Sequence, residues 1–168
     1  MRLLLQRVIR ARVTVSENTV GEIGPGLLVF LGIARSDTPK DADYLLDKLL
    51  WLRIFPDAEG KMNRNVQEAG GELLIVSQFT LYADCRRGRR PSFDPAAPPA
   101  QAEALYLYFL DAARKSPVRV QAGTFQASMQ VELVNDGPVT IMLDSVDRSD
   151  QRSAISTQPK APAPADAS

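Results

Sequence analysis

The sequence contains no histidine and a single cysteine among its 168 residues. The missing histidine excludes Ser-His-Asp and Cys-His catalytic arrangements and any zinc site that contains histidine. One cysteine forms neither a metal-binding cluster nor a disulfide framework. The carboxylates Asp57, Glu59, Asp84 and Asp94 do not have the spacing of a metal-binding loop. We therefore expect no metal and no cofactor, and chemistry based on hydroxyls, amides, carboxylates, arginines or the substrate itself.

The chain also lacks long apolar runs and an excess of either charge. No stretch approaches the roughly 20 apolar residues that a membrane-spanning helix requires, and the run at residues 3–5 is too short for a secretory leader. We expect a cytoplasmic protein with no membrane partner. Lysine plus arginine and aspartate plus glutamate each number 20, so the net charge is zero. A contact with RNA or DNA must therefore come from a local basic patch.

The length fits one domain, expected at residues 1–145, followed by a disordered tail at residues 146–168. The tail is rich in Ser, Asp, Gln, Ala and Pro. Its small apolar surface cannot offset the entropy that would be lost on ordering.

Within the domain, two proline-containing segments predict helix starts. Thr38-Pro39 precedes a helical spacing of apolar residues that reaches Leu52, and Pro98-Pro99 precedes a second such spacing. Apolar runs bounded by turn residues predict strands at residues 4–15, 19–23, 27–33, 73–76, 118–122, 130–134 and 139–143. This order predicts an α+β fold with two helices and a mostly antiparallel sheet or partly closed barrel.

The segment Ser77-Gln78-Phe79-Thr80 follows a predicted buried strand. Continued strand alternation would place Ser77 and Phe79 on one face and Gln78 and Thr80 on the other. Where the strand ends, backbone N–H groups lose their partners and become available to hold an oxyanion. The alternative is an ordinary polar loop. A covalent role for Thr80 is disfavoured because no base of the usual kind can be paired with it.

Asp136-Gly137-Pro138 lies between the last two predicted strands. An Asp-Gly pair is typical of a tight hairpin, and a plain hairpin is one interpretation. Proline does not fit a central strand, so Gly137-Pro138 predicts a bulge or turn, and an X-Pro bond is where a cis peptide is expected.

The run that contains Arg86, Arg87, Arg89 and Arg90 is the one dense basic segment. Arginines grip phosphates bidentately, so this segment is a candidate nucleic-acid contact, with a solvated loop as the alternative. Cys85 lies beside these arginines, but without a base it is a weak candidate nucleophile.

Taken together, these segments closely resemble the D-aminoacyl-tRNA deacylases. The resemblance covers Met1 to about Asp144 and rests on many motifs in the same order. They are Gln6-Arg7-Val8, Gly26-Leu27-Leu28, Leu52-Arg53-Ile54-Phe55, Gly60-Lys61-Met62-Asn63, Ser77-Gln78-Phe79-Thr80-Leu81, Gly88-Arg89-Arg90-Pro91-Ser92-Phe93 and Asn135-Asp136-Gly137-Pro138-Val139-Thr140.

The resemblance implies a homodimeric, cofactor-free hydrolase that cuts the ester between a D-amino acid and the terminal adenosine of tRNA, and that also clears glycine mischarged on alanine tRNA. Ser77–Thr80 would be the pocket motif. Gly137-Pro138 would be a Gly-cisPro element that enters the partner's pocket and excludes L-amino acids, with Arg7 beside it. Phe125 and Met129 would lie near the adenosine.

One departure from the family pattern is visible. Members usually have Gly and Asp where this chain has Gln126 and Ser128, which affects the local loop geometry. An aminoacyl ester is labile and carries a neighbouring ribose hydroxyl, so a site without histidine need only position it and stabilise developing negative charge. The competing interpretation is a non-catalytic RNA- or DNA-binding dimer that uses the basic segment.

Overall fold

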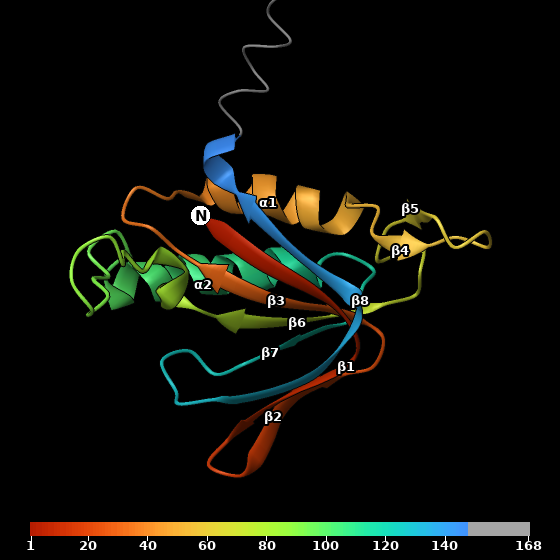
Figure 1. Cartoon of the computed structure of the whole chain (residues 1–168), viewed down its shortest axis with the longest axis horizontal. Coiled ribbons are helices and arrows are strands. Elements are labelled where there is room, and N and C mark those ends of the chain that lie inside the picture. The colour runs from red at the N-terminus through yellow and green to blue at the C-terminus, as the bar shows by residue number, and fades with distance from the viewer. Residues whose placement is uncertain (148–168) are drawn as a thin grey trace, which may run out of the picture.

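The first strand of the chain is the one around which the sheet is built (Figure 1). In the computed structural model, which describes residues 1–147, β1 pairs antiparallel with β2, β3 and β8. β8 follows one edge of β1, whereas β3 and β2 share the other edge. The elements are β1 (Arg2–Val15), β2 (Asn18–Ile23), β3 (Gly26–Gly32), α1 (Pro39–Trp51), β4 (Phe55–Pro56), β5 (Met62–Arg64), β6 (Glu72–Ser77), the 3-10 turn η1 (Phe79–Tyr82), α2 (Pro99–Arg114), β7 (Val120–Ala122), β8 (Gln130–Asp144) and the 3-10 turn η2 (Ser145–Asp147).

The predicted α+β class is confirmed, with a mixed sheet. β6 and β7 extend the sheet from β3 as parallel neighbours. Parallel neighbours need a long crossover connection, and the two crossovers carry α1 and α2. Both helices pack on the same face of the sheet and bury the larger core with β1, β3 and β6 (Figure 1).

On the side away from the helices, the sheet curves into the predicted partly closed barrel. β2 bends back to contact β6 and β7. The space that it covers is filled by a second apolar cluster of Val8, Ala11, Val13, Ile23, Leu28, Leu74 and Val76. β1 therefore serves two cores, because its first half supplies Leu3 and Leu5 to the helix side and its second half faces the barrel.

The interpretation of Asp136-Gly137 as a plain hairpin between two strands is wrong, whereas the prediction that Gly137-Pro138 forms a bulge or turn is confirmed. β8 is one strand that pairs with β1 along its length, with Gln6 opposite Thr140 and Val8 opposite Asn135. Residues 136–139 therefore bulge out of the ladder opposite Arg7. The Asn135 side chain spans the bulge, donating from Nδ2 to the Val139 carbonyl at 3.0 Å and accepting from the Val139 N–H at 2.8 Å. Asp-Gly here marks a bulge because both flanking segments pair with β1 rather than with each other.

Other differences are local. The short pair β4–β5 was not predicted, and the first strand begins at Arg2 rather than residue 4. The described chain continues past residue 145 through η2, and the remainder of the predicted tail, residues 148–168, lies outside the described residues. Within residues 1–147, no helix combines the length and apolar character needed to cross a membrane.

Candidate active site

A pocket of about 850 Å³ opens at the carboxyl end of β6. It brings together five of the residues predicted from the sequence: Ser77, Gln78, Phe79, Phe125 and Met129. The first three come from the end of β6 and the start of η1, and the other two come from the connection between β7 and β8. Segments that are far apart in the sequence thus meet around one cavity.

The strand does not continue beyond Ser77, so the predicted alternation of side chains at residues 77–80 is wrong. Gln78 donates its N–H to the Leu31 carbonyl at 2.8 Å, and the chain then turns into η1. As the first two residues of this turn, Phe79 and Thr80 cannot donate their N–H groups inside it, and within residues 1–147 these groups donate to no other backbone carbonyl. The N–H groups of Phe79 and Thr80 are therefore left without a main-chain partner at the start of a turn, and their use as oxyanion donors stays a prediction.

The Thr80 hydroxyl has a partner inside the motif. It accepts a hydrogen bond from Gln78 Nε2, and Thr80 itself is exposed and is not part of the pocket lining. No carboxylate, lysine or arginine side chain bonds to this hydroxyl in the described part of the chain. The geometry therefore favours a role for the Thr80 backbone over a role for its oxygen.

Phe125 and Met129 form another part of the pocket lining. The Phe125 ring lies 5.7 Å from the ring of Tyr106, whose hydroxyl donates to the Ile75 carbonyl at 3.0 Å. Burial raises the pKa of Tyr106 to about 12, so this hydroxyl stays protonated and structural. A Cβ on Gly123 would lie 2.7 Å from the Met129 sulfur, so glycine at this position lets Met129 pack against the backbone.

Gln126 also lines the pocket, and its backbone has a φ of 59°. This left-handed region suits glycine and is uncommon for other residues. At this position, where family members usually have glycine, the chain thus has a glutamine in a backbone conformation that glycine adopts more easily. The turn itself is formed, because the Ala127 N–H donates to the Thr124 carbonyl at 3.3 Å.

The Gly137–Pro138 peptide is cis, as the sequence predicted. Gly137 has a φ of 142°, and a Cβ there would lie 2.7 Å from Val139 Cγ2, so only glycine fits. Arg7, 8% exposed, fixes the bulge by donating from Nε to the Asp136 carbonyl at 3.1 Å and from Nη1 to the Ile54 carbonyl. None of Arg7, Gly137 and Pro138 lines the pocket of its own chain.

The basic segment forms an exposed loop closed by a bridge between Asp84 and Ser92. Arg86 is already occupied, because its side chain and its N–H bind the Asp84 carboxylate. These hydrogen bonds lower the pKa of Asp84 to about 2. Arg87, Arg89 and Arg90 are exposed and, within residues 1–147, have no ion pair. Arg86 therefore differs from the other three arginines of the loop, because its charge is paired with a carboxylate.

Two further side chains at the site were missed from the sequence. Arg2 donates to the Leu81 carbonyl in η1, and Arg35 lines the pocket. Nothing in the sequence around either residue distinguishes it from an ordinary surface arginine, because its role depends on contacts with distant segments. No group of three or more Cys, Asp and Glu side chains in residues 1–147 is arranged to hold a metal ion.

Sequence comparisons show close relatives. The family described as D-Tyr-tRNA(Tyr) deacylase matches residues 4–144. A D-aminoacyl-tRNA deacylase from Solibacter usitatus is 65% identical over 149 residues, which cover 89% of this chain and 99% of the relative. A protein of the same name from Thermotoga petrophila is 56% identical over 145 residues, which cover 86% of this chain and 97% of the relative.

Structural comparisons agree on the fold. A solved structure named c-Myc DNA Unwinding Element Binding Protein aligns with a TM-score of 0.81 and 44% identity, covering 86% of this chain and 98% of that chain. A second, described as a probable eukaryotic D-amino acid tRNA deacylase, aligns with a TM-score of 0.73 over 85% of this chain and 98% of that chain. At 22% identity, the second supports the fold alone.

Proposed function

The chain belongs to the D-Tyr-tRNA(Tyr) deacylase family, a family of hydrolases, and from this membership we propose that its pocket cleaves the ester between a D-amino acid and tRNA. The observation that carries the proposal is the pocket itself, which joins the Ser77–Phe79 backbone to Phe125 and Met129. Because charged tRNA is used in translation, the reaction is a proofreading step, and we place it in the cytoplasm.

The proposed catalytic groups are main-chain donors. Attack of water on the ester carbonyl places negative charge on the carbonyl oxygen, and the N–H groups of Phe79 and Thr80 stabilise that charge. The substrate supplies the labile ester and the adjacent ribose hydroxyl, and the pocket holds both in place. Ser77 and Gln78 line the pocket and orient the amino acid. This division of work requires no histidine.

The terminal adenosine is assigned to the side of the pocket that contains Phe125 and Met129. Both side chains are partly buried against the two cores and present an apolar surface. A flat purine ring packs well against an aromatic ring and a polarizable thioether. The adenosine would thus be bound through its faces, leaving the ester to reach the start of η1.

Selection against L-amino acids is assigned to Gly137-Pro138 of a second copy of the chain. The bulge lies on β8, away from the lining of its own pocket, so a homodimer is needed to bring it to a substrate. A backbone wedge at the substrate's α-carbon would reject an L side chain by contact. Glycine has no side chain and would pass, which accounts for the proposed clearance of glycine from alanine tRNA.

The activity is tested by the release of D-tyrosine and L-tyrosine from charged tRNA in the presence of a chelator. We expect rapid release of the D isomer only. Stable binding of tRNA without release of either isomer would instead support the competing interpretation, a non-catalytic RNA- or DNA-binding dimer that uses the basic loop.

The wedge in trans is tested by mixing two defective variants. Gly137→Ala alters the wedge and leaves the pocket of the same chain intact, whereas Ser77→Phe obstructs the pocket and leaves the wedge intact. Refolding the two together produces mixed dimers with one complete site, so D-specific release should return. If the mixture shows only the sum of the separate activities, the wedge does not act across subunits.

A further inference from the structure

Among the described residues that line the proposed active-site pocket, Arg35 is the one with a charged side chain. The rest of the lining is apolar or carries neutral polar groups, and it includes no carboxylate. The positive charge of Arg35 therefore has no carboxylate partner among the residues that line this pocket. It therefore fits an anionic group of the ligand and repels the ammonium group of an amino acid.

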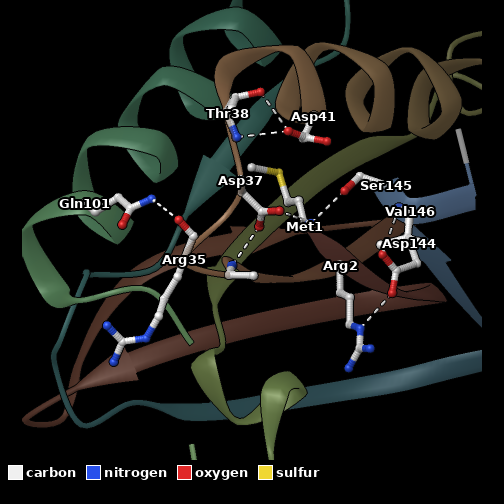
Figure 2. Close-up of polar contacts among 11 residues, drawn as sticks. Met1, Arg2, Arg35, Asp37, Thr38, Asp41, Gln101, Asp144, Ser145 and Val146 are labelled. Carbon is white, nitrogen blue, oxygen red and sulfur yellow. Dashed lines mark hydrogen bonds and ion pairs between the residues drawn. The ribbon is translucent and has the colours of Figure 1, made fainter. Parts of the chain in front are cut away.

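The backbone and the side chain of Arg35 both make hydrogen bonds, and Figure 2 shows the one between its carbonyl and Gln101. Its N–H donates to the Pro95 carbonyl at 3.2 Å, and its own carbonyl accepts from Gln101 Nε2 at 2.9 Å. The side-chain Nε donates to the Asp94 carbonyl at 2.8 Å. Within residues 1–147, no hydrogen bond or ion pair engages the two terminal nitrogens of this guanidinium. The Arg35 side chain is exposed, and its two terminal nitrogens are available to an anionic group.

The turn that carries Arg35 rests on a buried ionic cluster (Figure 2). The Asp37 carboxylate accepts from the Ala34 N–H at 2.6 Å and pairs with the α-amino group of Met1. The same amino group donates to Ser145 Oγ at 2.7 Å. Met1, Asp37 and Ser145 are all buried. This cluster fixes the turn that carries Arg35.

A second positive feature lies at the same edge of the pocket. Pro98 and Pro99, at the start of α2, line the cavity, and the Gln101 that binds Arg35 belongs to the first turn of this helix. The N-terminus of a helix of this length carries a partial positive charge, to which Pro98 and Pro99 contribute no N–H group. Arg35 and the start of α2 therefore favour the same kind of group, a phosphate.

We propose that Arg35 binds the phosphate that links the terminal adenosine of tRNA to the preceding nucleotide. The inference rests on the proposed function, in which the adenosine lies against Phe125 and Met129 of the same pocket. A guanidinium binds a phosphate through two parallel hydrogen bonds, and the free terminal nitrogens of Arg35 supply them. Arg35 would bind the phosphate and so position the substrate, and we assign it no contact with the ester.

The test compares two substrates that differ in this phosphate. D-tyrosyl-tRNA contains it, and D-tyrosyl-adenosine lacks it. For Arg35→Gln we expect KM for D-tyrosyl-tRNA to rise roughly tenfold, as for removal of one charge-assisted hydrogen bond, with kcat nearly unchanged. KM for D-tyrosyl-adenosine should not change. Arg35→Lys, which keeps the charge but not the bidentate geometry, should give an intermediate KM.

Arg114→Gln is the matched control. Arg114 lies at the other end of α2, in an exposed pair with Asp111 at 3.7 Å, so its loss should leave both KM values unchanged. An equal rise in KM for both substrates with Arg35→Gln would overturn the proposal, because the residue would then shape the pocket rather than bind the phosphate. Unchanged KM for both substrates would also overturn it.

A binding measurement separates this proposal from the proposed function. Calorimetry with adenosine 5′-monophosphate and with adenosine needs no hydrolysis. We expect the unaltered protein to bind the monophosphate more tightly and Arg35→Gln to remove the difference, even if neither ester is cleaved. Equal affinity for the two ligands in the unaltered protein would refute the phosphate site.

Discussion

Arg2 holds Leu81 through a hydrogen bond of 2.9 Å from its Nη1 to the Leu81 carbonyl. The same guanidinium lies 4.6 Å over the Tyr82 ring and donates from Nε to Asp144 at 2.8 Å. The first strand, the last strand and η1 are thus joined by one side chain. Because η1 presents the proposed oxyanion donors, Arg2 sets the position of the catalytic backbone without contacting substrate.

Arg2→Ala should therefore lower kcat for D-tyrosyl-tRNA by roughly tenfold, since loss of a charge-assisted hydrogen bond that fixes the donors is of this order. Steady-state kinetics at a temperature well below the melting transition will check this. Arg12→Ala is the control, because Arg12 is on the same strand in an exposed pair with Glu132 at 2.7 Å. An unchanged kcat in Arg2→Ala would show that η1 keeps its position without this contact.

Thr80→Ala should retain deacylation within about tenfold, because a neutral hydrogen bond contributes only about 0.5–1.5 kcal/mol and the Thr80 N–H remains. The substitution removes the hydrogen bond from Gln78 Nε2 to the Thr80 hydroxyl. Rapid-quench measurements will give the rate. A fall to the uncatalysed rate, or an acyl group trapped on Thr80 of the unaltered enzyme, would instead identify the hydroxyl as the nucleophile.

Removal of the charges at Arg87, Arg89 and Arg90 should weaken tRNA binding and flatten its salt dependence, while hydrolysis of bound substrate continues. For each phosphate that an arginine no longer neutralises, the slope of log K against log salt should fall by about 0.7–0.9. Arg86→Gln should have a smaller effect, because Arg86 is paired with Asp84. Filter binding at several salt concentrations will compare the two variants. Identical salt slopes in the triple variant and the unaltered protein would make the loop an ordinary solvated surface.

Protonation of Glu72 should make the free energy of unfolding depend on pH in the acid range. Its pKa is held below the usual value, first by the hydrogen bond from Arg119 and also by the N–H of Gly24, against the opposing effect of burial. A lowered folded-state pKa contributes stability above the unfolded pKa of about 4.3, and this contribution is lost as pH falls through the folded value.

Glu72→Gln should therefore lower the free energy of unfolding by roughly 1 kcal/mol at pH 7, the upper end for a partly exposed pair. The difference from the unaltered protein should shrink below about pH 4. Urea denaturation at pH 7 and pH 3 will test this. Glu59→Gln, which removes an exposed pair with Lys61, should have little effect at either pH. A constant difference at both pH values would show that the effect is not ionic.

The helix starts and the cis peptide were predicted correctly, because they depend on residues that are adjacent in the sequence. Thr38-Pro39 starts α1 as expected, and Asp41 accepts hydrogen bonds from both the N–H and the hydroxyl of Thr38. Pro98-Pro99 also starts α2 as expected, without a side-chain cap. The cis bond at Pro138 was expected, because proline has no N–H for the strand ladder and lowers the penalty for cis.

What the sequence did not predict depends on distant partners. An Asp-Gly pair forms a hairpin only if the flanking strands pair with each other, and here both pair with β1. The sequence also predicted that the strand ends at Ser77-Gln78, but not that the chain turns there into η1. The pocket contacts of Arg2 and Arg35 are long-range, and no pattern near these residues encodes them.

The pairing of β1 with β8 also limits how early the domain can fold during translation. A ribosome releases β1 first, yet one edge of this strand stays without its partner until residues 130–144 emerge. Pairings of such high sequence separation form slowly, and an open apolar strand edge is prone to aggregation meanwhile. Nascent chains that stop before β8 lack both the bulge and the Asp144 contact of Arg2. Synthesis of this deacylase therefore yields a complete candidate site only when nearly the whole domain has been translated.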